Sequence, residues 1–217
     1  MKKKIRVGAL ISGGGTNLQA IIDASRAGAI DADMVFVGSD NPAAKGLERA
    51  QRHGISDWVV DYAAVLRACR QDPGKVRPPE DFQLEDIRDK QAIFPPSADR
   101  NRVDPYLTSR AVAEARLLKA MPPDSFDLLV LAGFMRNLTP YFIDRVNKDR
   151  ARPRIMNIHP ALLPAFPGTD GYGDTFRYGC KVAGCTVHFV DYGEDSGPII
   201  GQRAFAVYED DTLESIR

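Results

Sequence analysis

Cysteine is scarce in this chain, which has only Cys69, Cys180 and Cys185 among its 217 residues. None of the three belongs to a C-x-x-C pair, and together they do not make the disulfide framework of a secreted domain. Their scarcity favours a reducing, cytoplasmic compartment. An excess of either charge is also absent, because Lys and Arg number 29 and so do Asp and Glu. No overall field therefore draws the chain to nucleic acid or to an anionic membrane.

Long apolar runs are missing as well. The basic start from Met1 to Arg6 is followed by an apolar run that ends at Ile11, before Ser12 and three glycines. That run is too short for a signal peptide or a membrane span. The sequence also has no His-Glu-x-x-His, no paired Cys/His cluster and no Gly-x-Ser-x-Gly elbow. We therefore expect neither a metal site nor a serine hydrolase.

What the sequence does contain is an alternation of apolar strands and amphipathic helices. This pattern predicts an α/β fold with an open, mostly parallel, Rossmann-like sheet and flanking helices. Two apolar stretches joined by a polar turn predict an antiparallel strand pair towards the C-terminus. The expected strands are 5–11, 33–37, 57–60, 127–133, 154–159, 184–190 and 198–208, and the expected helices are 16–27, 43–53, 107–121, 140–147 and one that begins at 211.

The segment from Ala63 to Asp104 interrupts this alternation. It is charged, contains Pro78-Pro79 and Pro95-Pro96, and has weak periodicity. A stretch of this length without clear elements is typical of a functional loop or a disordered insertion. We expect a surface insertion, rather than a small ordered subdomain, within a single domain that spans residues 1–217.

A glycine-rich turn, Ser12-Gly-Gly-Gly-Thr-Asn17, lies between the first expected strand and the first expected helix. Glycines allow backbone N–H groups to approach an anion, and a helix N-terminus adds partial positive charge. The turn lacks the lysine of a P-loop, and Leu18 replaces the third glycine of a dinucleotide fingerprint. Because Asp40 at the end of the second strand could bind a ribose, a nicotinamide oxidoreductase stays open, as does a turn without a ligand.

The stretch Ile155-Met-Asn-Ile-His-Pro160 is more specific. Asn157 and His159 are two residues apart on an expected strand, so they project from the same face. Pro160 ends the strand and places both at its carboxyl end, where open α/β sheets build their sites. An amide can stabilise a developing oxyanion and an imidazole can exchange protons near neutral pH. This pair therefore favours acyl transfer over a structural role.

The polar turn from Asp191 to Pro198 supplies a carboxylate. Asp195 or Asp191 could orient His159 and stabilise its protonated form, as in a His–carboxylate pair. Spacing does not choose between the two acids. His188 lies on an apolar strand and is expected in the core, whereas His53 is expected at the surface.

Four segments, in this order, resemble the family of phosphoribosylglycinamide formyltransferases, the folate-dependent enzymes of purine synthesis. Asn-x-His-Pro followed by Leu-Leu-Pro and Pro-Gly is the most specific part of the resemblance. The four segments are Ile11–Gln19, Leu131–Leu138, Asn157–Gly168, and Gly184–Val190 running into Asp195-Ser-Gly-Pro198.

The resemblance implies a role for each matching position. The catalytic residues would be Asn157, His159 and Asp195, so the resemblance prefers Asp195 over Asp191 as the acid. The phosphate of glycinamide ribonucleotide would be held by Gly14, Gly15, Thr16 and Asn17. The folate pocket would be lined by Met135, Arg136, Asn137, Leu138 and Asp191, with Arg136 near the pterin or its tail.

The implied reaction moves a formyl group from 10-formyltetrahydrofolate to the amine of glycinamide ribonucleotide, without a metal. The enzyme would act as a monomer or homodimer.

The family also has a C-terminal segment, after the helix expected near Asp211, that this sequence does not contain. Relatives with the same three residues include formyltetrahydrofolate deformylase, methionyl-tRNA formyltransferase and sugar formyltransferases. The deformylase normally has an N-terminal regulatory domain, and the tRNA enzyme normally has a C-terminal nucleic-acid domain. The glycine-rich turn further favours the ribonucleotide as substrate. A catalytically inactive nucleotide-binding module is the alternative from another class.

Overall fold

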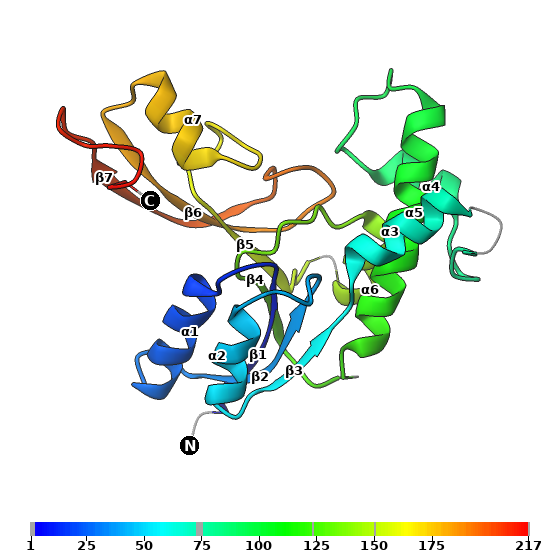
Figure 1. Ribbon diagram of the computed structural model, residues 1–217, viewed down its shortest axis with the longest axis horizontal. Helices are drawn as coiled ribbons and strands as arrows, with labels where there is room; N and C mark the ends of the chain where they lie inside the picture. Colours follow the sequence, from blue (N-terminus) through cyan, green and yellow to red (C-terminus); the bar gives the residue numbers. More distant parts are fainter. Residues whose placement is uncertain (1–2, 73–75, 123, 150, 217) are drawn as a thin grey trace.

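Seven strands form one sheet in the order β3-β2-β1-β4-β5-β6-β7 in the computed structural model, which describes residues 3–72, 76–122, 124–149 and 151–216 (Figure 1). Strands β1 to β5 are parallel, whereas β6 is antiparallel to both β5 and β7. The predicted fold class is therefore confirmed. The strands are β1 Ile5–Ile11, β2 Ala32–Ser39, β3 Ser56–Val59, β4 Leu128–Leu131, β5 Ile155–His159, β6 Val182–Phe189 and β7 Ile199–Ala206.

Helices cover both faces of the parallel part of the sheet. Buried residues of α1 and α2 pack with Val7, Ala9 and Ile11 of β1, while those of α3, α5 and α6 form a second core with Leu10 and β4. Alternate residues of β1 thus face opposite layers, as a strand buried on both sides requires. The helices are α1 Thr16–Arg26, α2 Gly46–Arg52, α3 Tyr62–Gln71, α4 Leu84–Lys90, α5 Arg100–Ala120, α6 Pro140–Val146 and α7 Gly171–Tyr178.

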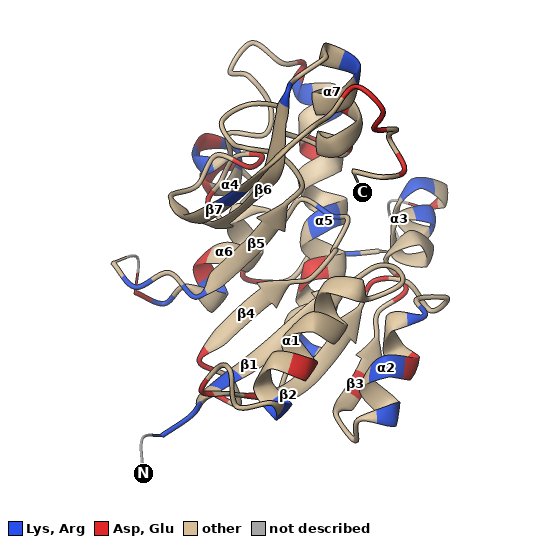
Figure 2. Ribbon diagram, turned by 90° about the vertical axis from the view of Figure 1, so that its left-hand side faces the viewer, with Lys and Arg blue, Asp and Glu red and all other residues tan. Residues whose placement is uncertain are grey.

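Charged residues lie mainly on the helices and loops. Figure 2 shows Lys, Arg, Asp and Glu of both signs around the outside of the sheet, while β4 and β5 carry none of these four residue types. Among the described residues, no helix is both long enough and apolar enough to cross a membrane.

The switch point in the strand order lies between β1 and β4. The chain adds strands outward from β1 to β3 and then returns to the other side of β1 with β4, so the order reverses at this point. Residues near the carboxyl ends lie side by side, because Leu10 pairs with Leu131 and Leu131 with Asn157. Open α/β sheets bind their ligands outside such a reversal.

The segment 63–104 differs from the prediction, since most of its described part is helical. Helices α3 and α4 lie within it or at its edge, and α5 begins at Arg100 rather than Leu107. Asp61 caps α3 by accepting from the Ala64 N–H at 2.8 Å, and Asp99 caps α5 in the same way. Residues 73–75 lie outside the described part of the chain.

A small third core explains why this segment is ordered. Ile87 of α4 packs with Val103 and Leu107 of α5 and with Tyr141 of α6, and all four are buried. The sequence predicted a later start for α5 because Pro105, which has no N–H, ordinarily ends or kinks a helix. Here the helix runs through the proline, and burial beside it supplies the stabilisation that local sequence lacks.

Two further elements differ near the C-terminus. Helix α7 was missed because Gly171 and Gly173 in its first turn are weak helix formers. The helix expected from Asp211 is instead a set of turns over 213–216, with a bond from the Ile216 N–H to the Thr212 carbonyl, and Arg217 lies outside the described residues.

Glu114, a fully buried acid on α5, holds the start of α6. Its carboxylate accepts hydrogen bonds from the backbone N–H and the hydroxyl of Thr139, at 2.7 and 2.6 Å. Burial raises the pKa of Glu114 to about 7, although the bonds from Thr139 oppose the shift.

We expect Glu114→Gln to remove a pH dependence of stability. A carboxyl whose folded pKa lies above its unfolded value of about 4.3 destabilises the fold as pH rises between the two, here up to about pH 7. Glutamine can keep both contacts to Thr139 but does not titrate. Chemical denaturation at pH 4.5 and at pH 7.5 should measure this effect. Between the two pH values, the unfolding free energy of wild type should fall by up to a few kcal/mol more than that of the variant. Equal losses in the two proteins would contradict this role.

Candidate active site

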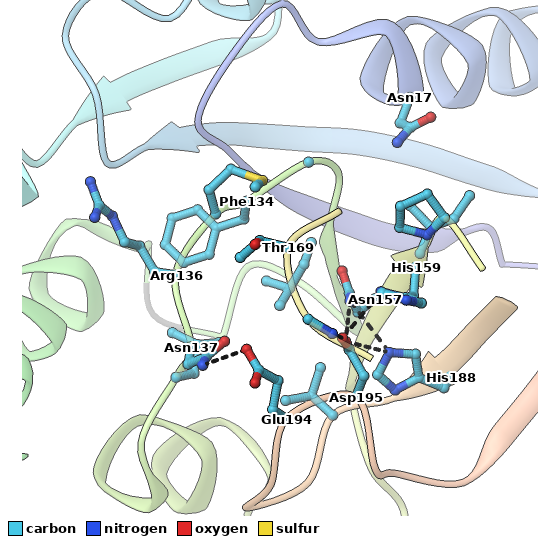
Figure 3. Close-up of a pocket in the computed structure, with 18 of the residues that line it drawn as sticks. Asn17, Phe134, Arg136, Asn137, Asn157, His159, Thr169, His188, Glu194 and Asp195 are labelled. Atoms are coloured by element: carbon cyan, nitrogen blue, oxygen red, sulfur yellow. Dashed lines mark hydrogen bonds and ion pairs between the residues drawn. The ribbon is translucent and has the colours of Figure 1, made fainter. Parts of the chain in front are cut away.

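A cleft of about 520 Å³ opens at the carboxyl ends of β4 and β5. Its walls come from the start of α1, the loop 133–138 after β4, the end of β5 with the loop that follows, the start of α7, strand β6, and the turn 191–195 after β6. Figure 3 shows polar side chains from these parts pointing into one space. The volume lies within the range of small-molecule sites.

Asn157, His159 and Asp195 meet in this cleft (Figure 3). The His159 Nδ1 atom lies 3.1 Å from Asp195 Oδ2, and the Asn157 side-chain amide donates to Asp195 Oδ1 at 3.4 Å. Asp191 has a different contact, because its Oδ1 accepts from the Gly193 N–H and the Ser196 hydroxyl and so braces the turn. Of the two acids that the sequence left open, Asp195 is therefore the one beside His159.

His188 is a residue of the site that the sequence reading assigned to the core. It is 2% exposed, as a core residue would be, but it also lines the cleft. Its Nε2 lies 3.4 Å from Asp195 Oδ1 and 3.3 Å from the amide nitrogen of Asn157. The antiparallel register that pairs Asn157 with His188 brings them together, and no local sequence signal reports that register.

The charge state of the His159–Asp195 pair follows from its neighbours. Burial lowers the pKa of His159, but the hydrogen bond and charge of Asp195 and the Phe166 carbonyl outweigh it, so the net pKa is raised. Burial raises the pKa of Asp195, yet bonds from His159, His188 and the Gly168 N–H bring it well below its usual range. The geometry therefore favours a carboxylate beside an imidazolium.

The loop after β5 closes over this pair. The carbonyl of Phe166 lies 2.7 Å from His159 Nε2, and the Gly168 N–H donates to Asp195 Oδ2 at 2.9 Å. Phe166 adopts a φ of 54°, which is unfavourable for a bulky residue. Residues with such backbone angles are concentrated at functional sites. At the start of α7, Gly171 leaves room for the ring, because a Cβ there would lie 3.0 Å from His159 Nε2.

The loop after β4 carries the residues expected to line a folate pocket, and Met135 to Leu138 all line the cleft. Met135 is 60% exposed and its N–H donates to the Ser12 hydroxyl at 2.8 Å. Asn137 donates to Glu194 of the opposite turn at 3.0 Å (Figure 3). Leu138 is buried in the core, so only part of it borders the cleft.

The side chain of Arg136 points away from His159 (Figure 3). Its Nε donates to Asp40 Oδ2 at 2.5 Å, and its guanidinium lies 5.3 Å from the centre of the Tyr62 ring. Asp40 is the acid that could have bound a ribose in a dinucleotide site. It is 1% exposed and paired with Arg136, an arrangement that does not favour the oxidoreductase alternative.

The glycine-rich turn leads directly into α1. Gly15 adopts a φ of 71° at the N-cap position, and α1 begins at Thr16 without a side-chain cap. Thr16 and Asn17 are exposed and line the cleft. Gly14 and Gly15 lie in the turn that precedes α1 and are not part of the cleft lining. Among the residues that the structure describes, no group of three or more His, Cys, Asp or Glu side chains is placed to hold a metal ion.

An open α/β sheet with an amide, an imidazole and a carboxylate gathered at its strand ends is an arrangement suited to an enzyme of acyl-group transfer. A family profile described as "Formyl transferase" matches residues 5–217. The chain belongs to the formyl transferase family, which confirms the resemblance drawn from its four segments.

Similar proteins support this membership. The phosphoribosylglycinamide formyltransferase of Bacillus subtilis (strain 168) is 33% identical over 205 residues, covering 94% of this chain and 81% of its own length. A crystal structure of glycinamide ribonucleotide transformylase 1 from Symbiobacterium toebii is 38% identical with a TM-score of 0.70, covering 100% of this chain and 80% of that one.

The chain also matches part of a longer protein. The trifunctional purine biosynthetic protein adenosine-3 of Drosophila melanogaster is 36% identical over 217 residues, covering 99% of this chain but only 13% of its own length. The chain therefore spans about one-eighth of this relative and about four-fifths of the bacterial one.

Proposed function

We propose that this enzyme transfers the formyl group of 10-formyltetrahydrofolate to the amine of glycinamide ribonucleotide. The observation that carries the proposal is the meeting of Asn157, His159 and Asp195 in one cleft that borders both the glycine-rich turn and the loop after β4. The names of the relatives, which include phosphoribosylglycinamide formyltransferase, agree with the proposed amine substrate.

The three residues fit the steps of formyl transfer. The amine nitrogen of the substrate bonds to the formyl carbon, and the formyl oxygen gains the negative charge of a tetrahedral intermediate. The Asn157 amide can donate to that oxygen, and the His159 imidazolium can do so when its Nε2–H leaves the Phe166 carbonyl. Losing one such donor typically lowers the rate ~10²–10³-fold. The bond from this carbon to N10 of the folate then breaks, N10 takes up a proton and the amine loses one. Asp195 is placed to help move that proton.

The two substrates would enter from different sides. The start of α1, with Thr16 and Asn17, offers its positive end to a phosphate. Met135, Arg136 and Asn137, together with Asp191 of the turn 191–195, would line the folate side. Figure 3 shows Asn17 above His159 and Asn137 to the left of it, on the other side of Asn157. Separate sides for the two substrates suit a reaction in which the orientation of two bound molecules supplies much of the rate enhancement.

A direct assay tests the proposal. We expect the purified protein to formylate glycinamide ribonucleotide in a reaction that depends on 10-formyltetrahydrofolate. We also expect folate, and not NAD, to raise its melting temperature. Formylation of methionyl-tRNA or of a sugar amine, without formylation of the ribonucleotide, would contradict the substrate assignment. Stabilisation by NAD alone would favour the oxidoreductase alternative instead.

A further inference from the structure

The glycine-rich turn is held in place by α2, a helix that the reaction itself does not use. The carbonyl of Gly13 accepts a hydrogen bond from the Gly46 N–H at 3.0 Å. The next carbonyl, that of Gly14, accepts from Arg49 Nε at 2.8 Å. Two successive carbonyls of the turn therefore point towards α2.

This arrangement decides where the amides of the turn point. In a planar trans peptide, a carbonyl and the following N–H point in opposite directions. Fixing the carbonyls of Gly13 and Gly14 towards α2 therefore directs the N–H groups of Gly14 and Gly15 away from it. Neither N–H has a hydrogen-bond acceptor within the described part of the chain, and the space around Gly14 is open. Adjacent free N–H groups beside a helix N-terminus form an anion-binding concavity.

The turn and α2 fit closely enough for this contact to be specific. A Cβ atom at Gly15 would lie 2.7 Å from the Cα of Gly46 and 3.4 Å from Cδ of Arg49. Arg49 is half-buried, and its Nη1 donates to the side chain of Gln19 on α1 at 3.2 Å. Its planar guanidinium thus bridges the turn and the helix that follows, which a lysine ammonium cannot do with the same geometry.

We propose that Arg49 is a positioning residue for the substrate phosphate, acting by presetting the Gly15 amide of the glycine-rich turn; this rests on the proposed function. The ligand class is a phosphate monoester. Arg49 also adds one positive charge beside the turn in a chain whose formal net charge is zero. The residue acts on binding of the phosphate and not on the formyl transfer step.

The test compares Arg49→Ala and Arg49→Lys with Arg52→Ala, a control on the exposed side of the same helix. We expect Arg49→Ala to raise KM for glycinamide ribonucleotide roughly 10- to 100-fold, with kcat nearly unchanged. Arg49→Lys should give a smaller increase and Arg52→Ala none. With glycinamide riboside, which lacks the phosphate, kcat/KM should be equal in wild type and all three variants.

Binding of inorganic phosphate, followed by calorimetric titration, separates this proposal from the proposed function. We expect weaker phosphate binding by both Arg49 variants than by wild type, even if wild type formylates a different amine. Equal phosphate affinity in wild type and Arg49→Lys would overturn the proposal. So would an equal loss of kcat/KM with the ribonucleotide and the riboside, because that would indicate general damage to the fold.

Discussion

Replacing His159 by alanine is expected to lower kcat/KM for formyl transfer by about 10²–10⁴-fold, the range typical of a lost proton-transfer group. The imidazole is 2% exposed, faces the cleft and is paired with Asp195, so it is placed both to polarise the formyl oxygen and to exchange protons. Steady-state kinetics with glycinamide ribonucleotide and 10-formyltetrahydrofolate would measure the loss.

A matched control is His53→Ala, which removes a histidine that contacts Gln19 away from the cleft. We expect this variant to keep wild-type activity. Circular dichroism and the melting temperature should show that His159→Ala remains folded. Activity of His159→Ala within a few-fold of wild type would contradict the catalytic assignment of His159. Absence of formyl transfer by wild type itself would favour an inactive nucleotide-binding module.

The second large effect is expected from Asp195→Asn, which keeps the shape of the side chain but removes its charge. In the His–Asp pair of serine proteases the corresponding change costs about 10⁴-fold in kcat, and we expect a loss on the order of 10²–10⁴-fold here. Without the carboxylate, the pKa of His159 should fall, because Asp195 supplies most of the interactions that raise it.

This second variant also has a distinct pH signature. A histidine with a raised pKa stays protonated to higher pH, so wild type should lose activity only as pH rises through that raised value. In Asp195→Asn the same decline should occur at lower pH. A pH profile of kcat/KM measures the shift, and Asp191→Asn serves as the control because Asp191 does not contact His159. A decline at unchanged pH would indicate that His159 does not act as the protonated group.

The parts of this enzyme that could be predicted from sequence are those where a local period decides the structure. β1 is found at Ile5–Ile11 as expected, and the two-residue spacing of Asn157 and His159 on β5 does put both in the cleft. Because Pro160 ends the strand, the sequence also predicted that this pair lies at the carboxyl end of β5 and projects from one face of the sheet.

The remaining parts depend on contacts between distant segments. His188 joins the site through the pairing of β5 with β6, and a buried histidine on an apolar strand looks the same in sequence whether or not it borders a cleft. Spacing could not separate Asp195 from Asp191, and only the resemblance to formyltransferases favoured Asp195, the acid that lies beside His159. The start of α5 was missed because burial of Val103 and Leu107 outweighs the effect of Pro105.

The assembly of the cleft has a consequence for how the chain reaches its active form. The contact between Ser12 and Met135 joins residues separated by 123 positions, and the pairing of β1 with β4 places their two loops side by side. Closing so long a loop costs entropy before any contact repays it, which slows folding. We therefore expect recovery of formyl transfer after denaturation to depend on the joining of β1 with β4.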